Sequence, residues 1–555
     1  MASINFLLKD LTSNGFDIKT LENLIPKIGM EIEKYDDNEI VLDITPNRPD
    51  MLDFTGFLRA IKAFTGISTT STGIEYKIEN EPFINIYVDE KIKKIRPFIG
   101  AVIVKNVNLK ENKFQYLINF IEKFTDTFGR KRKKFAIGLY DFNKIKPDLY
   151  YTISKNKKFI PLDYNQEMNF NEILSKHDKG IKYKNIIENK TSKNYYPILK
   201  DSEKILSLIP IINSEQSKIT ENTKNLLIDV TGISENAINQ ALSIISCSFL
   251  DQNAKIFPVK IHYKNKIGIA PNLVHKQIKI KTNNINKNIG IKIDEKTALE
   301  LLQRMGYASK LKQKNILVNI PPYRTDIFDQ QDIIEDIAIA YGYENIEPKP
   351  IIGNFEGSSD PIKEYSEKFS LFMIGLGFSE VINPVLTNEK LNFENMLQQY
   401  NKNNVIKIIY SKTEAISIIK TSLIPNLLNN LEVSSNQKMP LKIFEIGSIF
   451  YLNEKKINED LCLSFASEHS KANFAEIKAD VSALMKLSNH NNYKLAEEKN
   501  NSFIEGRCAA IYINNEKFGI FGEIHPKVLK NFNLDESVVV AELIIKKNIE
   551  YEYRI

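Results

Sequence analysis

Apolar and polar residues alternate in four successive stretches of the chain, each with its own pattern of predicted strands and helices. In the first stretch, residues 1–80, the pattern predicts a strand over residues 40–44, a turn with two prolines and then a helix. The apolar positions of this helix recur at helical spacing, at Leu52, Phe57, Leu58, Ile61 and Phe64. We expect a small domain of strands and helices here, followed by a polar linker over residues 71–90.

The second stretch, residues 95–263, begins with the strand-like segment "FIGAVIVKNVNL" and the amphipathic helix "NKFQYLINFIEKFTDTFG". Further on, "NLLIDVTGISENAINQALSIISCSF" predicts a buried strand, a tight turn at Gly232 and a second helix. The alternating run "DQNAKIFPVKIHY" predicts an edge strand that closes the unit.

The third and fourth stretches cover residues 270–350 and 360–555. In the third, "HKQIKIKTNNINKNIGIKI" alternates like two strands around an Asn/Lys turn, and "DEKTALELLQRMGY" predicts a helix with an acidic cap. The fourth reads as a larger unit of strands and helices, without a fixed-period repeat or a glycine-rich phosphate loop. The chain as a whole is therefore predicted to be a multidomain protein of the α+β or α/β class.

A predicted helix within "YRTDIFDQQDIIEDIAIAYGYENI", residues 323–346, carries an unusual amount of negative charge. Its carboxylates are Asp326, Asp329, Asp332, Glu335 and Asp336, and Arg324 is the one cation close before them. At 100° per residue the last four carboxylates fall on one face, opposite Ile333, Ile334, Ile337 and Tyr341. Like charges three and four residues apart each cost a few tenths of a kcal/mol, so the cluster needs an explanation.

Two interpretations of this acidic helix remain open from the pattern alone. In one, the acids form a solvated face near the positive end of the helix dipole, with Asp326 as a cap. In the other, Asp332, Glu335 and Asp336 supply oxygens from one face to a hard cation such as Mg²⁺, and Asp326 reaches over from before the helix.

Composition and charge place the chain among folded proteins without choosing a partner. It has 555 residues, 43% hydrophobic and 26% charged, with a net charge of +6 that permits RNA as a partner but does not require it. The basic run Arg130 to Lys134 is either a contact for phosphates or a solvated loop. Three cysteines far apart argue against a zinc ribbon or a disulfide framework and suit a reducing cytoplasm. We also expect no signal peptide and no membrane helix.

Several segments together resemble the beta subunit of phenylalanyl-tRNA synthetase. "PPYRTDIFDQQDIIEDIAIAYGYENI" resembles that family's B5 domain, and "DITPNRPDMLDFTGFLRAI" resembles its B1 region. "KKFAIGLYD", "YYPIL" and "LLIDVTGISENAINQAL" resemble its B3/B4 editing domain. "LFMIGLGFSEVINPVL", "SLIPNLLNNL" and "FEIGSIF" resemble its C-terminal B6/B7 module. These segments occur in the family's order and together span most of the chain.

The resemblance implies a domain order and a type. It implies a B1-like domain over residues 1–80, a B3/B4 editing domain over 95–263, a B5 domain over 270–350 and a B6/B7 module over 360–555. The last is expected to be an antiparallel sheet with helices, similar to a class II synthetase core. The chain is shorter than the usual bacterial form and shows no inserted oligonucleotide-binding domain, so we expect the archaeal/eukaryotic-like type.

The resemblance also assigns a metal to the acidic helix. In the family the corresponding carboxylates bind Mg²⁺ at a site shared with the alpha subunit. Carried over by position, the implied ligands are Asp326, Asp332, Glu335 and Asp336. Many relatives have histidine where Asp329 stands, so Asp329 is left as a solvated acid.

The implied overall reaction is ATP-dependent attachment of phenylalanine to tRNA(Phe) in an (alpha-beta)2 heterotetramer in the cytoplasm. Class II catalytic cores carry an Arg two residues before a Glu and a later glycine-rich motif that ends in Arg. In "FEIGSIF" the residue two before Glu445 is Ile443, and "FGIFGEIHP" contains no Arg. We therefore expect a catalytically silent module that pairs with the alpha subunit through an apolar surface, and ATP to bind mainly to the alpha subunit.

Chemistry on this chain is expected in the editing domain. A pocket for phenylalanine cannot strongly reject tyrosine, which merely adds a hydroxyl, so a second, hydrolytic site for Tyr-tRNA(Phe) is physically reasonable. The resemblance points to Leu199, Ser207, Asp229 and Thr231. Asp229 would accept the tyrosyl hydroxyl or hold water, and Thr231 would bind substrate or water. The competing interpretation is that Asp229 and Thr231 cap the turn before the helix "SENAINQAL".

Two alternatives to an editing beta subunit stay open at this point. One is a non-enzymatic tRNA-binding or assembly subunit whose editing site has decayed. The other, from pattern alone, is a metal-dependent phosphotransferase that uses the acidic helix, although no nucleophile or phosphate-binding motif lies near those acids.

Overall fold

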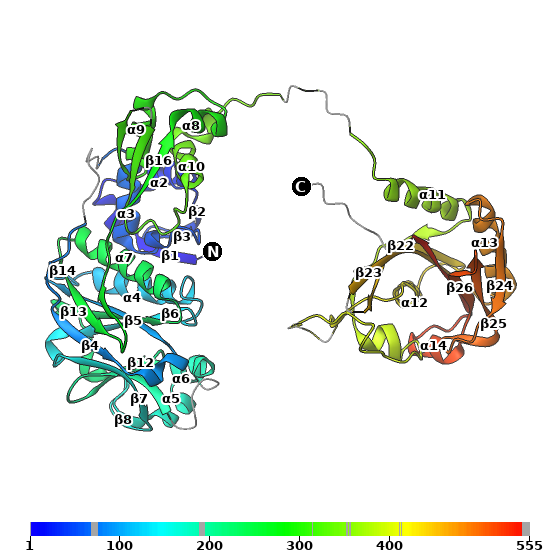
Figure 1. The fold of residues 1–555 in the computed structure, drawn as a ribbon, viewed down its shortest axis with the longest axis horizontal. Helices are drawn as coiled ribbons and strands as arrows, with labels where there is room; N and C mark the ends of the chain where they lie inside the picture. The colour runs from blue at the N-terminus through cyan, green and yellow to red at the C-terminus, as the bar shows by residue number, and fades with distance from the viewer. Residues whose placement is uncertain are drawn as a thin grey trace. The chain divides into compact units, whose positions relative to one another are not determined.

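The computed structural model of the chain divides into two compact units, residues 1–350 and 351–555 (Figure 1). It describes residues 2–67, 76–187, 195–313, 315–350, 353, 357–409, 411, 413, 415–454 and 456–546. The first unit contains all three of the segments predicted as B1-like, editing and B5 domains, and the second contains the predicted C-terminal module.

The start of the first unit is a three-stranded antiparallel sheet in the order β1-β3-β2. Its strands are β1 Ala2–Leu7, β2 Glu31–Tyr35 and β3 Glu39–Ile44. Its helices are α1 Leu8–Thr12, α2 Ile18–Leu24 and α3 Phe54–Phe64, with 3-10 turns at Pro26–Ile28 and Pro49–Leu52. The predicted strand and helix are confirmed, and Asp53 caps α3 by accepting a hydrogen bond from the Gly56 N–H.

A ten-stranded sheet forms the middle of the first unit, in the order β12-β11-β10-β7-β4-β14-β5-β13-β6 with β15 beside β14. In chain order its strands are β4 Ile84–Val88, β5 Phe98–Lys105, β6 Phe135–Asp141, β7 Leu149–Lys155, β10 Tyr195–Lys200, β11 Ile205–Leu208, β12 Ile212–Asn213, β13 Asn225–Gly232, β14 Lys255–His262 and β15 Ile267–Ala270. Two short strands, β8 Lys158–Phe159 and β9 Met168–Asn169, pair separately. The associated helices are α4 Lys113–Asp126, α5 Phe170–Lys176, α6 Asp178–Tyr183 and α7 Glu235–Asp251, with 3-10 turns at Glu90–Lys94, Phe142–Lys144, Lys184–Ile186 and Glu215–Ser217.

Two expectations for this sheet were wrong. Strand β4 lies inside the stretch predicted as a linker and pairs in parallel with β14 and β7; residues 68–75 lie outside the described part. Strand β14 was predicted at the edge, but it lies between β4 and β5. Its alternating pattern reflects a sheet with one buried face, which an interior strand of a mixed sheet also shows.

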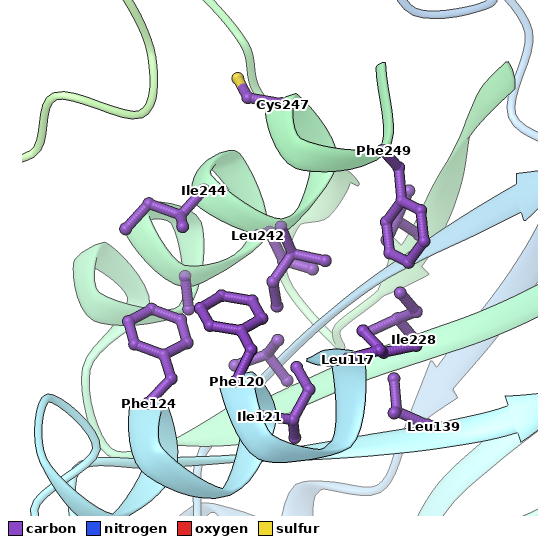
Figure 2. Packing of buried hydrophobic residues seen from close by; sticks show 14 of the residues in the cluster. Leu117, Phe120, Ile121, Phe124, Leu139, Ile228, Leu242, Ile244, Cys247 and Phe249 are labelled. Atoms are coloured by element: carbon purple, nitrogen blue, oxygen red, sulfur yellow. The ribbon is translucent and has the colours of Figure 1, made fainter. Parts of the chain in front are cut away.

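Helices α4 and α7 pack together over one face of the sheet (Figure 2). Phe120 and Phe124 of α4 and Leu242 of α7 are buried with Ile228 of β13 in one hydrophobic cluster. Because side chains alternate across a strand, the neighbours of Ile228 along β13 point to the opposite face of the sheet. That opposite face carries Asp229 and Thr231.

The end of the first unit is a three-stranded antiparallel sheet, β16-β18-β17, with three helices. The elements are β16 Lys276–Lys281, α8 Thr282–Ile289, α9 Glu295–Arg304, β17 Ala308–Lys312, β18 Asn315–Ile320, α10 Gln330–Tyr341 and a 3-10 turn at Tyr343–Asn345. Helices α9 and α10 were predicted. The Asn/Lys turn and the second strand expected after it were both wrong: residues 282–289 form helix α8, which buries Ile285 and ends at Gly290 in a left-handed conformation, and no strand lies between α8 and α9 in the described residues 290–294.

The second unit is built on a seven-stranded sheet in the order β19-β22-β23-β27-β26-β25-β24, antiparallel except between β19 and β22. Its strands are β19 Ser379–Glu380, β22 Leu441–Asn453, β23 Lys456–Glu468, β24 Tyr493–Glu497, β25 Phe503–Ile513, β26 Glu516–Ile524 and β27 Val538–Lys546. Strands β20 Leu386–Thr387 and β21 Ile418–Ile419 pair separately. The helices are α11 Pro361–Gly375, α12 Ile424–Val433, α13 Phe474–Leu487 and α14 Pro526–Asn531, with a π-helical turn at Lys390–Glu394. This confirms the antiparallel sheet with helices that was predicted for this module.

Candidate functional site

A cavity of about 330 Å³ lies where the two ends of the ten-stranded sheet come together. The Asn213 side-chain amide on β12 donates a hydrogen bond to the Leu139 carbonyl on β6, 3.0 Å away, although these strands stand at opposite ends of the strand order. The sheet therefore curls on itself. Strands β6 and β13 form one wall of the cavity and the β11–β12 segment forms another.

Asp229 lies in this cavity wall as a buried carboxylate with an unpartnered oxygen. Its side chain is 2% exposed, and Oδ1 has no hydrogen-bond partner among the described residues. Asp229 stands opposite Gly138 on β6, and a Cβ at Gly138 would clash with the Asp229 carboxylate and with the Tyr140 hydroxyl. The glycine thus provides the space that both groups occupy. Burial raises the pKa of Asp229 from 3.8 to about 6, with the Tyr140 hydroxyl and Arg96 acting in the opposite direction.

The other polar groups of the cavity are held by buried partners. The Tyr140 hydroxyl donates to Ser207 Oγ at 2.9 Å. Arg96 Nε donates to Thr231 Oγ1 at 3.1 Å, and its Nη2 donates to the Thr231 carbonyl at 2.6 Å. Burial lowers the pKa of Arg96 to about 10, so this guanidinium stays protonated at neutral pH. Thr231 and Ser207 are therefore fixed in orientation before any ligand enters.

Of the four residues predicted for this site, the structure brings three together. Asp229, Thr231 and Ser207 line the cavity. Leu199 does not line it; it is fully buried in the hydrophobic cluster and pairs with Ser207 across β10 and β11. Leu199 is thus placed to support Ser207 rather than to contact a ligand.

The capping interpretation of Asp229 and Thr231 was wrong. Both residues lie within strand β13, and the cap of α7 is Ser234, whose side chain accepts from the Ala237 N–H. Sequence reasoning missed Tyr140 and Arg96. Tyr140 follows Gly138 by two residues at the end of a run that is apolar from Phe135 to Leu139, and Arg96 is a charged residue two positions before the buried strand β5. Each is a polar exception in an apolar context, which is the signal that was available.

The carboxylates in and before the acidic helix α10 make different kinds of contact. Asp329 is the N-cap and accepts from the Gln331 N–H at 2.7 Å, whereas Asp326 had been considered for this role. Asp332 completes the capping box, accepting from the Phe328 and Asp329 N–H groups at 2.7 and 3.0 Å. Glu335 is exposed. Ile333, Ile334 and Ile337 are buried, as predicted.

Asp326 and Asp336 share an internal cation. Arg324 Nη2 lies 2.8 Å from Asp326 Oδ2 and 2.6 Å from Asp336 Oδ2, and the Tyr307 hydroxyl also donates to Asp336. The Arg324 side chain is 2% exposed. Asp336 is therefore buried and does not belong to a solvated face, which corrects the prediction that four acids share the water side of the helix.

The predicted Mg²⁺ ligands do not fit a metal ion in this arrangement. Two of them are paired with Arg324, Asp332 accepts two backbone N–H groups in the capping box, and Glu335 is exposed. In the described part of the chain, no three His, Cys, Asp or Glu side chains are grouped so as to hold a metal. The magnesium assignment stays a prediction that these residues alone do not support.

Replacement of Asp329 by alanine should loosen the start of α10. Losing an N-cap costs about 1 kcal/mol, which is roughly a five-fold change in a local opening equilibrium. Amide hydrogen exchange over residues 330–334 should therefore become about five-fold faster. Glu335→Ala on the exposed face is the control and should change exchange little. Unchanged exchange in Asp329→Ala would remove the capping role.

Glu445 in the second unit is fully engaged by internal partners. Lys420 Nζ lies 2.7 Å from Glu445 Oε1, and the Asn383 side-chain amide donates to Oε2 at 2.9 Å. Both charged side chains are 3% exposed or less. A carboxylate paired in this way inside the fold is a structural group and has no free oxygen for a ligand.

Among the described residues, no helix has both the length and the apolar character needed to cross a membrane. The three cysteines are buried and unpaired.

Comparison with known sequences and structures gives consistent matches along the chain. The profile described as "Phenylalanyl tRNA synthetase beta chain CLM domain" matches residues 347–545, "tRNA synthetase B5 domain" matches 278–343 and "B3/4 domain" matches 90–247. A phenylalanine–tRNA ligase beta subunit of Archaeoglobus fulgidus is 34% identical, over 95% of this chain and 95% of its own length. One from Methanococcus maripaludis is 34% identical, over 97% and 98%.

A solved structure matches the first part of the chain. It is an N-terminal fragment of the phenylalanyl-tRNA synthetase beta subunit from Pyrococcus horikoshii, 35% identical, with a TM-score of 0.58. The match covers 61% of this chain and 99% of the fragment.

Proposed function

Because this chain belongs to the family of phenylalanine–tRNA ligase beta subunits, of the archaeal type, we propose that it charges tRNA(Phe) with phenylalanine in complex with an alpha subunit and that it hydrolyses mischarged Tyr-tRNA(Phe) in its own cavity. The reaction of the complex uses ATP. The complex is an (alpha-beta)2 heterotetramer in the cytoplasm.

Amino-acid activation belongs to the alpha subunit in this proposal. Stabilising the charge that develops at the α-phosphate of ATP needs cations placed around the phosphates. The position where a class II core would carry its Arg is Ile443 here, and Glu445 is paired with the buried Lys420. The second unit therefore serves to bind the alpha subunit rather than to bind ATP.

One observation carries the editing proposal: the unpartnered carboxylate oxygen of Asp229 in a cavity whose other polar groups are already engaged. A buried acceptor without a donor costs free energy, so it favours a ligand that brings its own donor. A tyrosyl group supplies an O–H at the end of an apolar ring, and a phenylalanyl group does not. The apolar cavity residues Ile118, Ile121 and Leu139 suit the ring.

Hydrolysis then requires that the site position the tyrosyl ester and a water molecule next to each other. Water attacks the carbonyl carbon of the tyrosyl ester, the bond from that carbon to the tRNA oxygen breaks, and the tRNA oxygen takes a proton. The products are tyrosine and tRNA(Phe). Thr231 Oγ1, oriented by Arg96, and Ser207 Oγ, oriented by Tyr140, are the groups available to position substrate or water.

Charging is tested by producing the chain alone and together with an alpha subunit of the same family. We expect Phe-tRNA(Phe) to form in the mixture and not with the chain alone, because the chain lacks the cationic groups of an activating site. Charging by the chain alone would contradict the division of labour between the subunits.

A non-enzymatic tRNA-binding or assembly subunit is the alternative function. It has the same matches to the family but would leave the ester of Tyr-tRNA(Phe) intact. Deacylation of Tyr-tRNA(Phe) by the chain above the uncatalysed rate excludes this alternative.

A further inference from the structure

The basic loop, residues 129–134, connects α4 to β6 and has no part in the function proposed so far. It carries Arg130, Lys131, Arg132, Lys133 and Lys134. The side chains of Arg130, Lys131 and Lys133 are exposed, whereas Arg132 and Lys134 are half-buried.

The backbone of the basic loop adopts a conformation that side chains disfavour. Arg130, Lys131 and Arg132 have consecutive φ values of 51°, 50° and 64°, in the left-handed region that normally suits glycine. Hydrogen bonds from the Lys131 N–H to the Asp126 carbonyl and from the Lys134 N–H to the Gly129 carbonyl, both 2.9 Å, hold this turn in place. Strained residues of this kind persist where the surroundings fix them, and they cluster at functional sites.

Arg132 ties the basic loop to the wall of the cavity. Its Nη1 donates to the Pro210 carbonyl at 3.0 Å and to the Ile211 carbonyl at 2.8 Å, and its guanidinium lies 4.3 Å from the centre of the Tyr183 ring. Arg132, Pro210 and Ile211 all line the cavity that holds Asp229. Arg132 thus fixes the loop at the cavity, while the side chains of Arg130, Lys131 and Lys133 stay exposed to solvent.

Within the described part of the chain, the exposed cations of the basic loop have no acidic partner. No ion pair joins Arg130, Lys131 or Lys133 to a carboxylate in the described residues. The acids on the preceding helix have lysines of their own, since Glu122 lies 3.7 Å from Lys179 and Asp126 lies 3.6 Å from Lys182. Burial, followed by the charge of Arg130, lowers the pKa of Lys134. An uncompensated cluster of like charge on a rigid loop favours a polyanion as its partner.

We propose that Arg130, Lys131 and Lys133 bind phosphates of the single-stranded 3′ end of aminoacyl-tRNA and so guide its terminal ester into the Asp229 cavity. The proposal rests on the editing function for the identity of the tRNA end, but the binding itself does not need hydrolysis. The anchored Arg132 sets the loop against the cavity, so phosphates that contact the loop lie close to the terminal ester. The strained, pre-set turn means that little ordering is needed when the RNA binds.

The test combines Arg130→Ala, Lys131→Ala and Lys133→Ala in the full chain and leaves the anchor Arg132 intact. The matched control removes the same charge at Lys91, Lys93 and Lys94, which are exposed and do not line the cavity. Each phosphate contact to a single strand adds about 0.7 to the slope of log affinity against log salt. Between about 50 and about 200 mM salt, the wild-type affinity for tRNA(Phe) should therefore fall roughly 20-fold more than that of the loop variant.

Binding of a truncated tRNA that ends at the last base pair of the acceptor stem shows which part of the tRNA contacts the loop. The loop variant should bind this truncated tRNA as well as the wild type does, because the phosphates in question are missing. Equal affinity and equal salt slope of wild type and loop variant for intact tRNA would overturn the proposal. An equal loss with the truncated tRNA would also overturn it, since the loop would then bind another part of the molecule.

Deacylation of Tyr-tRNA(Phe) gives a second readout. In the loop variant KM should rise at least about 10-fold with kcat nearly unchanged, because phosphate contacts hold ground state and transition state alike. A fall in kcat with KM unchanged contradicts the proposal. If the wild type does not deacylate Tyr-tRNA(Phe) at all, the editing function fails while the tRNA-binding measurements still decide the role of the loop.

Discussion

Replacing Asp229 by alanine is expected to slow the deacylation of Tyr-tRNA(Phe) on the order of 100-fold, since a hydrogen bond to a buried charged group is worth roughly 1.5–3 kcal/mol. In the wild-type cavity none of the described residues donates a hydrogen bond to Asp229 Oδ1, and the tyrosyl hydroxyl supplies that donor. Without the carboxylate, the tyrosyl hydroxyl would itself be buried without an acceptor. Single-turnover deacylation with the purified chain in excess over Tyr-tRNA(Phe) measures the loss directly.

Asp229→Asn and Asp163→Asn are the variants that separate this loss from misfolding. Asparagine keeps the shape of Asp229 and removes its charge, so it should also be slow. Asp163 lines the same cavity, but its side chain is 69% exposed and pairs with Lys218 at 2.7 Å. Its neutralisation should change the rate by no more than a few-fold. Wild-type rates in Asp229→Ala would take this residue out of the site.

The raised pKa of Asp229 gives the same variant a pH signature. Below pH about 6 the carboxyl group is protonated and becomes a weaker acceptor, so the wild-type rate relative to Asp229→Asn should fall as the pH drops through about 6.

The folding stability that Asp229 contributes has the opposite pH dependence: it rises as the pH drops. A folded pKa raised from 3.8 to about 6 stabilises the fold below pH 3.8, and this contribution is lost as the pH rises through about 6. Asp229→Asn should therefore gain up to about 3 kcal/mol of stability above pH 7 and nothing below pH 3.8.

Replacing Arg324 by leucine is expected to destabilise the first unit by about 3–5 kcal/mol, because it leaves the buried Asp336 and the partly buried Asp326 without their cation. Arg324 bridges Asp326 and Asp336 with a side chain that is 2% exposed. The loss should be visible as an earlier calorimetric unfolding transition. Lys264→Leu is the control: Lys264 pairs with Glu90 at 2.8 Å with both side chains more than half exposed, and such pairs contribute at most about 1 kcal/mol.

Chelation distinguishes Arg324 from a metal as the partner of these acids. Because the guanidinium already occupies Asp326 and Asp336, removing divalent cations with EDTA should leave the wild-type transition of the chain unchanged. A lower transition temperature after chelation, restored by Mg²⁺, would show that these carboxylates hold a metal and that the Arg324 bridge is not the main source of their stability.

The elements that sequence predicted well are those whose local signals agree with their packing. In α10 the buried isoleucines recur at helical spacing behind an acidic start, and in α9 Asp294 caps a helix with buried Leu301 and Leu302. Local propensity and burial point to the same element in both cases. The boundaries follow to within a few residues.

The elements that sequence missed depend on partners far along the chain. Strand β4 is a short segment in a polar stretch, and its place is set by β14, more than 160 residues later. Helix α8 was missed because its Asn and Lys residues read as a polar turn between strands; its two isoleucines, Ile285 and Ile289, lie four residues apart, and Ile285 is buried in the core of this part of the unit. The pairing of β4 with β14 leaves no signal in the local pattern of β4.

The candidate site was likewise predicted only in part from the sequence. Resemblance pointed to Asp229, Thr231 and Ser207, which the curled sheet brings together, but Leu199 lies in the core beside them. Charge patterning predicted an acidic face on α10, yet it did not foresee that Arg324, before the helix, would fold back between Asp326 and Asp336. The backbone turn before the helix places the Arg324 side chain inside the fold. The sequence shows which residues form this turn, but it does not show where the side chain of Arg324 points.

The measurement that tests the account most directly is the ratio of deacylation rates for Tyr-tRNA(Phe) and Phe-tRNA(Phe) with the wild-type chain under single-turnover conditions. A site that hydrogen-bonds a substrate hydroxyl discriminates strongly against the analogue that lacks it, so the rate with the tyrosyl ester should be at least about 100-fold higher. Equal rates for the two esters, or rates no higher than those without protein, would contradict the assignment of the Asp229 cavity as an editing site.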